Sequence, residues 1–275
     1  MAVITLFSAS YCNGEEVAAG VADRLGFRRV DDESLIAAAS EQSGAPPDKL
    51  RTALFGAPGF FNKLTRAKEK YAAQLRLAVT DLVEPDDVVY HGFGGLLLPN
   101  TLSHVLRACL AAPRGYRVEQ AGLEGLSARD AQRQIEKDDV ACAEWTKFLF
   151  DLGPWDKSLY DCFLPMQSTA VVEAVDTLSG YAVQPTAQMK DDAQKALEDC
   201  RLAARVNMAL VEEGHDTDVS SKDGDVTILI RKHTMRLERL QAELVAVAKE
   251  VSGVKQATAR PGPRCVEPSV YARMD

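Results

Sequence analysis

The chain has 275 residues and a net charge of −8, and 46% of its residues are hydrophobic. Domains usually contain about 100–200 residues, so this length predicts two of them. The negative charge argues against a general nucleic-acid-binding protein, which needs a basic surface to displace counterions from phosphates. No apolar run approaches the roughly 18 residues of a membrane-spanning helix, so we expect no membrane span.

The first residues, Met-Ala-Val-Ile-Thr-Leu-Phe, lack the basic and long apolar segments of a signal peptide. The six cysteines form no Cys-x-x-Cys pair and show no metal-ligand spacing with the four histidines. Free thiols are typical of a reducing compartment. We therefore expect a cytoplasmic protein without a metal site.

Short apolar runs alternate with helical patterns over the first part of the chain. Residues 3–8 form a strand-like run, and the apolar spacing from Gly14 to Gly26 predicts a helix directly after it. Further strands are expected at 87–90, 105–112 and 162–166, and further helices at 31–43, 64–83, 127–150 and 171–178. Residues 48–62 are rich in glycine and proline, and we expect a loop there.

This alternation predicts an α/β fold with a parallel sheet covered by helices on both faces. Ligands of such sheets bind at the carboxyl ends of the strands. The loops after Phe7, Tyr90 and Ala112 are therefore expected to surround one crevice.

The pattern changes after Gly180, where Gln184-Pro185-Thr186 indicates a linker. The spacing then predicts a helix, a hairpin with an Asp-Gly turn, a second helix and a last strand, at 191–211, 217–231, 235–251 and 254–259. This order, α-β-β-α-β, is that of a small α+β domain. We expect an α/β domain over 1–180, the α+β domain over 190–262 and a loosely ordered tail over 263–275.

Seven short motifs in the first domain occur in the order found in the cytidylate-kinase-like family, which this domain resembles. They lie at residues 4–18, 25–36, 88–95, 104–113, 117–118, 125–139 and 155–161. The resemblance implies a P-loop kinase fold. It also implies ATP and Mg²⁺ as cofactors, with a nucleoside monophosphate such as CMP or dCMP as substrate.

The resemblance also supplies candidate binding residues. Those for phosphate or cofactor are Ser8, Ser10, Asn13, Gly14, Arg117 and Lys137, and those for substrate are Asp32, Gly92 and Gly94. Asp32 matches an acidic family position and would hold a ribose, a base or a metal-bound water. Its alternative role is to cap the helix that follows. Both Arg117 and Lys137 have the alternative of being ordinary helix charges.

Positive charge is scarce where a phosphoryl-transfer enzyme needs it. The loop between Phe7 and Val17 contains no lysine or arginine, and larger residues replace the family's loop glycines. Glu15 and Glu16 occupy the first helical turn, where they stabilise the helix but repel a triphosphate. Phe93 stands where the family has an arginine. We assign no catalytic residue, and the sequence shows no Ser/His/Asp set.

The second domain resembles the BON module in three segments, around Val206, at 223–228 and at 251–254. It lacks that module's usual glycine after the second strand, where Ile230 and Arg231 stand. BON modules are associated with phospholipid or other ligands, so the resemblance implies a protein or lipid-like ligand for this domain.

Three functional hypotheses follow. The first is a nucleotide- or ligand-responsive regulatory or scaffold protein with degraded phosphate-binding motifs and little kinase activity. The second is an active CMP or dCMP kinase that uses ATP through unconventional basic residues. The third is a protein-interaction subunit that binds no nucleotide. We favour the first, because the loss of charge recurs at the loop, at Phe93 and in the lid segment.

Overall fold

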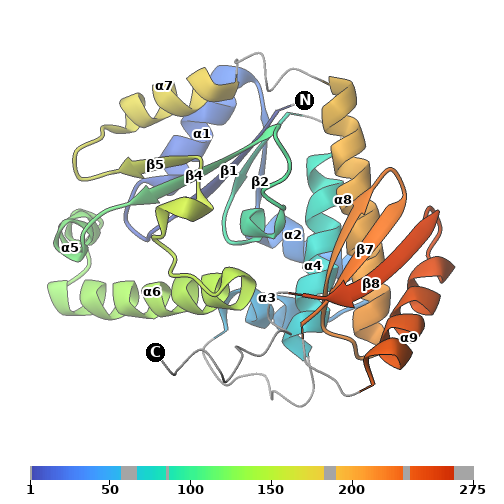
Figure 1. Cartoon of the computed structure of the whole chain (residues 1–275). Coiled ribbons are helices and arrows are strands. Elements are labelled where there is room, and N and C mark those ends of the chain that lie inside the picture. Colours follow the sequence, from blue (N-terminus) through green and yellow to red (C-terminus); the bar gives the residue numbers. More distant parts are fainter. Residues whose placement is uncertain (1, 57–66, 85–86, 183–189, 232–235, 263–275) are drawn as a thin grey trace, which may run out of the picture.

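The computed structural model describes residues 2–56, 67–84, 87–182, 190–231 and 236–262, and within them five short strands form one parallel sheet (Figure 1). The central strand is β1 (Val3–Ser8), in the order β2-β3-β1-β4-β5. Its companions are β2 (Arg28–Asp31), β3 (Val88–His91), β4 (Val105–Ala111) and β5 (Cys162–Pro165). Every pairing in this sheet is parallel, as the sequence predicted.

Helices cover both faces of this sheet, and residues of β1 alternate between the two cores. Ile4 and Leu6 pack with α1 and α7, whereas Val3 and Phe7 pack with the helices on the other face. The first pair is α1 (Gly14–Leu25) and α7 (Val171–Ala182), and the second group includes α2 (Asp32–Ser43), α4 (Ala67–Val83) and α6 (Ala128–Phe150). Burial on both faces explains why these strands are continuous apolar runs.

Three elements differ from the expectation. Residues 47–55 form helix α3 (Pro47–Phe55) instead of a loop, because proline suits the first helical turn and one face is apolar and buried. The rest of the expected loop lies outside the described residues, apart from Gly56. Strand β2 is an edge strand in which Val30 alone is buried, so it lacks an apolar run. Helix α5 (Arg114–Leu123) buries only two residues and also escaped prediction.

The C-terminal unit has the predicted order α-β-β-α-β. Its strands β6 and β7 are antiparallel and β8 pairs with β7 in parallel, so β7 is central. The elements are α8 (Lys190–Glu212), β6 (Thr217–Lys222), β7 (Asp225–Ile230), α9 (Leu237–Glu250) and β8 (Gln256–Pro261). At the hairpin, Asp223 and Gly224 have φ of 55° and 90°, which fits the Asp-Gly turn read from the sequence. Val206, Ile228 and Leu244 belong to this unit's own core.

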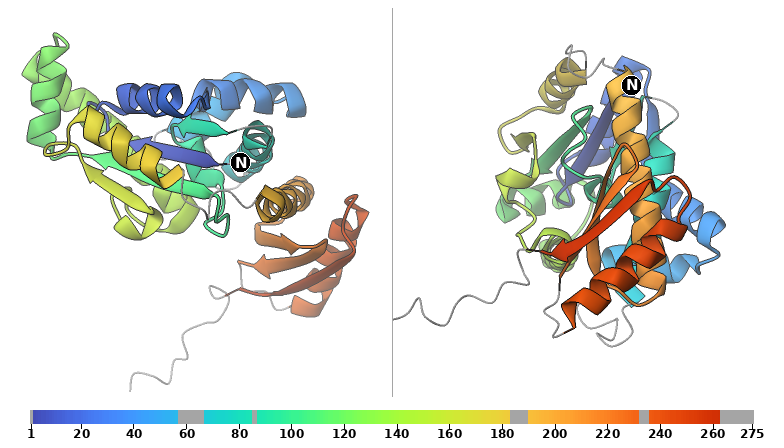
Figure 2. Two further views of the ribbon diagram at one scale, coloured as in Figure 1. Left: turned by 90° about the horizontal axis from the view of Figure 1, so that it is seen from above. Right: turned by 45° about the vertical axis from the view of Figure 1, so that its right-hand side comes forward.

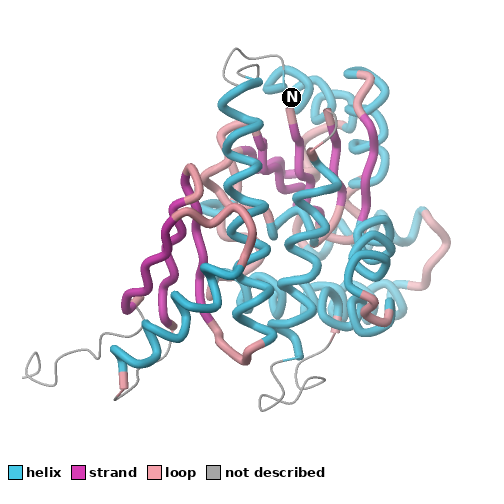
Figure 3. The backbone as a smooth tube through the Cα atoms, turned by 90° about the vertical axis from the view of Figure 1, so that its right-hand side faces the viewer, coloured by secondary structure: helices cyan, strands magenta, loops and turns pink. Residues whose placement is uncertain are grey.

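Helix α8 connects the two units, and Figures 2 and 3 show it between the first unit and the three-stranded sheet. Its residues Leu197 and Cys200 belong to a core of the first unit. Arg201 Nε lies 2.6 Å from Asp81 in the last turn of α4, and its Nη1 lies 2.7 Å from Oε1 of Glu84, which directly follows that helix. The expected linker at 184–186 and the tail at 263–275 lie outside the described residues, so the domain boundaries stay a prediction.

Two other expectations concern absences. No helix in the described part of the chain is long and apolar enough to cross a membrane. The five cysteines in that part are buried and unpaired.

Candidate functional site

A pocket of about 310 Å³ lies at the carboxyl edge of the parallel sheet, beside the ends of β1 and β3. The strands β2 and β3 lie on one side of β1, and β4 and β5 lie on the other, so the strand order reverses at β1. α/β proteins bind ligands at such a reversal. The pocket is lined by Ser8, Asp31, Asp32, Glu33, Phe55, His91, Gly92 and Phe93. Two of the three expected loops, those after Phe7 and Tyr90, therefore contribute to it.

The loop between β1 and α1 brings the start of a helix close to two residues that line the pocket, Ser8 and His91. Tyr11 and Asn13 have left-handed backbones, with φ of 60° and 56°, and α1 begins at Gly14. A Cβ at Gly14 would lie 2.7 Å from His91 Nε2 and would also strike Ser8 Oγ, so this position requires glycine. The Asn13 side chain donates to Glu16 at 2.9 Å and does not cap the helix.

Ser8, His91 and Glu15 form a chain of polar contacts at this edge. Ser8 Oγ lies 2.9 Å from His91 Nε2, and His91 Nδ1 lies 3.3 Å from Glu15 Oε2. Arg29 donates to the other oxygen of Glu15. The hydrogen bond from Arg29, followed by the charge of Arg29 and the contact with His91, lowers the pKa of Glu15.

The sequence did not reveal this set because 83 residues separate Ser8 from His91. Parallel pairing of β1 with β3 places Leu6 opposite His91, and Ser8 follows two residues later on the same face of the strand. The signals in the sequence were a histidine directly after the strand expected at 87–90 and an acidic first turn in the helix after β1.

Asp32 holds the loop that follows β3, a structural role that the sequence did not indicate. It accepts hydrogen bonds from the Tyr90 hydroxyl at 2.7 Å and from the backbone N–H groups of Phe93 and Gly94, both at 2.8 Å. Burial raises the pKa of Asp32, although these bonds favour its charged form. The expected helix cap is instead Asp31, which accepts from the Ser34 N–H at 2.8 Å.

Gly92 and Gly94 are required by the same packing. Gly92 has φ of 144°, and a Cβ there would strike the Asp32 carboxylate. A Cβ at Gly94 would strike Tyr90 and Leu35. These glycines hold the loop around Asp32, and Gly92 lies in the wall of the pocket.

The remaining candidates lie toward α5 and α6. Arg117 is 3% exposed and donates to both oxygens of Asp139, with Nη1–Oδ1 at 2.8 Å. Lys137 is exposed. Burial raises the pKa of Asp138, whereas the hydrogen bond from Gln134 and the nearby hydroxyl of Ser10 lower it.

The carboxylates of Glu124 and Asp138 also lie near the β1–α1 loop, on the side of α5 and α6. Burial raises the pKa of Tyr11, and the negative charges of Glu124 and Asp138 raise it further. Arg29 and Arg51 lie near the pocket but already pair with Glu15 and with Glu33. Among the residues that the structure describes, no lysine or arginine lines the pocket.

These observations test whether ATP and Mg²⁺ fit. The β1–α1 loop lacks a cation and is flanked by acidic groups, so it does not offer the charge neutralisation that a triphosphate requires. The described residues contain no group of three or more acidic, histidine or cysteine side chains that could hold a metal. The described residues around this loop do not fit a nucleotide–magnesium complex.

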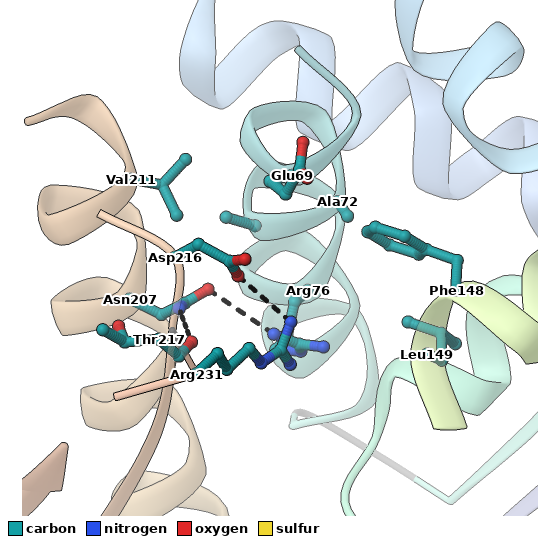
Figure 4. A pocket seen from close by; sticks show the side chains of 11 residues that line it. Glu69, Ala72, Arg76, Phe148, Leu149, Asn207, Val211, Asp216, Thr217 and Arg231 are labelled. Atoms are coloured by element: carbon teal, nitrogen blue, oxygen red, sulfur yellow. Dashed lines mark hydrogen bonds and ion pairs between the residues drawn. The ribbon is translucent and has the colours of Figure 1, made fainter. Parts of the chain in front are cut away.

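A second pocket, of about 30 Å³, lies where α4 meets the C-terminal unit (Figure 4). Arg76 of α4 donates a long hydrogen bond of 3.5 Å to Asn207 of α8. Arg231 pairs with Asp216 at 3.2 Å and with Asp218 at 3.0 Å. Burial, followed by the charge of Arg231, lowers the pKa of Arg76. Polar side chains therefore connect α4 directly to the C-terminal unit.

Comparisons with known proteins agree with the fold. The model of a family described as cytidylate kinase-like matches residues 3–168, which is more than half of the chain. No curated protein matches the chain.

Among solved structures, the chain is similar to an uncharacterized protein from Eubacterium ventriosum, with 15% identity and a TM-score of 0.50. That match covers 66% of this chain and 98% of the other. A shikimate kinase from Bacteroides thetaiotaomicron matches with 11% identity and a TM-score of 0.40, over 66% of this chain and 99% of the other. A gluconokinase from Sinorhizobium meliloti matches with 14% identity and a TM-score of 0.39, over 66% and 93%. The first similarity supports the α/β fold alone.

Proposed function

Because the chain belongs to the cytidylate kinase-like family, we propose that it is a ligand-responsive regulatory or scaffold protein with little kinase activity. In this proposal the phosphate-binding motifs are degraded, while the pocket at the carboxyl edge of the sheet still receives a small ligand. A pocket of about 310 Å³ is within the size range of small-molecule sites.

The pairing of Arg117 carries this proposal. Phosphoryl transfer depends on cations that neutralise the charge of the transferred group, and such an arginine contributes several powers of ten in rate. Arg117 is buried and held by both oxygens of Asp139. An arginine that is buried and paired with a carboxylate in this way offers little net positive charge to a phosphate. Lys137 is exposed and lies beside Asp138, so its charge is also partly offset.

A coupled assay with ATP, Mg²⁺ and either CMP or dCMP tests the loss of kinase activity. An ordinary kinase turns over about 1–100 times per second, and we expect a rate far below one per second. A rate within the ordinary range would overturn the proposal and favour the active CMP or dCMP kinase. In that case Lys137→Gln should abolish the activity, and Arg133→Gln, one turn earlier on the same helix and exposed, should serve as its control.

A thermal-shift screen of nucleotides, with and without Mg²⁺, separates the proposal from its third alternative. A ligand that binds only the folded state raises the melting temperature. We expect at least one small ligand to do so while kinase activity stays low. If no nucleotide or nucleoside changes the melting temperature, the interaction subunit without nucleotide binding becomes the better hypothesis.

The C-terminal unit is the output module in this proposal. Its resemblance to BON modules suggests a protein or lipid-like ligand. The contacts of α8 with α4 would transmit occupancy of the pocket, because Leu197 and Arg201 of α8 pack and pair with the first unit. We place the protein in the cytoplasm, and the described cysteines, which are all unpaired, agree with this location.

A further inference from the structure

We propose that Ser8 is an activated nucleophile, with His91 as its general base, and that the pocket hydrolyses small neutral carboxylic esters. Ser8 Oγ lies 2.9 Å from His91 Nε2, and both residues line the pocket of about 310 Å³. This inference goes beyond the proposed function, because it needs neither a nucleotide nor phosphoryl transfer.

The order of contacts is that of a nucleophile, a base and an orienting acid. In the tautomer with its proton on Nδ1, His91 donates to Glu15 at 3.3 Å and accepts from Ser8 through Nε2. Arg29 holds the Glu15 carboxylate from its other oxygen. Glu15 contacts neither the pocket nor a reacting atom, so it acts as a positioning residue.

The start of α1 supplies the oxyanion donors. The first N–H groups of a helix have no partner within the helix, and they favour negative charge. Helix α1 begins at Gly14, whose Cα lies against Ser8 and His91, and Asn13 does not cap it with its side chain. When Ser8 attacks an ester, negative charge develops on the carbonyl oxygen, and these backbone N–H groups would stabilise it.

The lining of the pocket sets the substrate class. Asp31, Asp32 and Glu33 line it, and no lysine or arginine of the described part of the chain does, so these carboxylates disfavour anionic substrates. Phe55 and Phe93 form the apolar part, with ring centroids 5.0 Å apart in an edge-to-face arrangement. A neutral ester with a short acyl chain suits a pocket lined by these carboxylates and phenylalanines.

The reaction balances without any cofactor. Ser8 Oγ bonds to the carbonyl carbon and its proton passes to His91 Nε2. The bond to the alcohol oxygen breaks, and the same proton leaves with the alcohol. His91 then takes a proton from water, whose oxygen bonds to the acyl carbon, and returns that proton to Ser8 Oγ as the bond between Ser8 and the acyl group breaks. One ester and one water give one carboxylic acid and one alcohol.

Two measurements on the full chain test this inference. A fluorophosphonate probe should form an adduct that mass spectrometry places on Ser8, and p-nitrophenyl butyrate should be hydrolysed above the background rate. Ser8→Ala should abolish labelling and lower hydrolysis by at least about 100-fold, as should His91→Gln, because base catalysis contributes about 10²–10⁴-fold. Glu15→Gln should lower kcat by about tenfold without changing KM, which a merely structural role would not do.

His215→Gln is the matched control. His215 also pairs with a glutamate, Glu243 at 3.4 Å, but lies in the C-terminal unit away from the pocket. This variant should keep full labelling and hydrolysis, and melting curves should show that every variant is folded. An unlabelled wild-type chain, or Ser8→Ala that hydrolyses the ester as fast as wild type, would overturn the inference. Neither result bears on the kinase assay, so the two proposals fail separately.

Discussion

Arg117 and Asp139 form a bidentate pair, with Nη1–Oδ1 at 2.8 Å, between two helices beside the β1–α1 loop. The pair lies close enough to Cys12, a loop residue, for both charges to act on the pKa of its thiol. Burial nevertheless dominates there and raises that pKa to about 11. The arginine that the family resemblance assigns to phosphate is therefore neutralised from within the chain.

Asp139→Asn should release this arginine. Removing one partner of a buried ion pair leaves an uncompensated charge, so we expect the free energy of unfolding to fall by about 3 kcal/mol. The freed guanidinium should also bind inorganic phosphate or ATP at least about threefold more tightly, a gain of about 0.7 kcal/mol. Denaturant titrations and calorimetry measure the two effects.

Glu136→Gln is the control for this variant. It breaks the contact of Arg114 with Glu136, whose side chains are 52% and 69% exposed, and such surface pairs contribute under about 1 kcal/mol. Equal stability of Asp139→Asn and wild type would show that Asp139 does not hold Arg117 in solution.

The two glutamates at the start of α1 should differ in their effect on anion binding. The charge of Glu15 is compensated by Arg29, whereas Glu16 is bonded, among the described residues, only to the neutral side chain of Asn13. At an effective dielectric of 20, a unit charge about 6 Å away contributes roughly 3 kcal/mol before screening. Glu16→Gln should therefore tighten ATP binding by about tenfold and Glu15→Gln by less, in calorimetry at low salt.

Salt provides the internal check on this prediction. Screening at about 0.15 M ionic strength should shrink the difference between the two variants, since the Debye length is then about 8 Å. A larger gain for Glu15→Gln would contradict the pairing with Arg29.

His104 should make the protein sensitive to mild acid. It is 3% exposed, and neither ring nitrogen has a hydrogen-bond partner among the described residues. Burial, together with the charge of Arg107, lowers the pKa of His104 to about 4. The unfolded chain takes up this proton near pH 6.5 and the folded chain only near pH 4, so stability is complete above about 6.5 and falls across this window.

The loss should reach up to about 2 kcal/mol once solvent screening is allowed for. His104→Leu should flatten this part of the curve of unfolding free energy against pH, while His215→Gln should leave it. An unchanged slope in His104→Leu would assign the acid sensitivity to other groups.

The elements that sequence predicted well are those with a continuous apolar signal. The run at 3–8 is buried on both faces, and the periodic helices after Gly14 and Ser127 begin within a residue of their expected starts. Ser127 caps the latter, because its Oγ accepts from the Asp130 N–H. By contrast, β2 is held by pairing with β3 at the sheet edge, and only tertiary context makes such a segment a strand.

The sequence predicted where the site lies but not which side chains interact there. Family motifs led to Ser8 and Gly14 at the strand-to-helix turn, and the structure places both beside the pocket. The roles of His91 and Asp139 depend on which side chains meet across strands and helices far apart in sequence. Nothing in a local pattern could show that Arg117 is paired or that Asp32 turns toward Tyr90.

Limited proteolysis tests the predicted boundary between the domains. The sequence places a linker at 184–186, so a protease should release a fragment of about 180 residues. Because Arg201 pairs with Asp81 and Glu84, the two pieces should remain associated in gel filtration at low salt. A core that resists cleavage between 180 and 190 would contradict the boundary.

Two leucines on α8 should report on different units. Leu197 is 1% exposed and belongs to a core of the first unit, so Leu197→Ala should cost about 2–4 kcal/mol there. Both tryptophans, Trp145 and Trp155, lie in the first unit, and their fluorescence follows its unfolding. Leu202, less than two turns further along α8, belongs to the core of the C-terminal unit.

If the two units unfold separately, Leu197→Ala should lower the midpoint of the tryptophan transition in denaturant, and Leu202→Ala should leave it nearly unchanged. Equal shifts of this transition in both variants would show that the chain unfolds as one cooperative unit through α8, and would contradict the two-domain prediction.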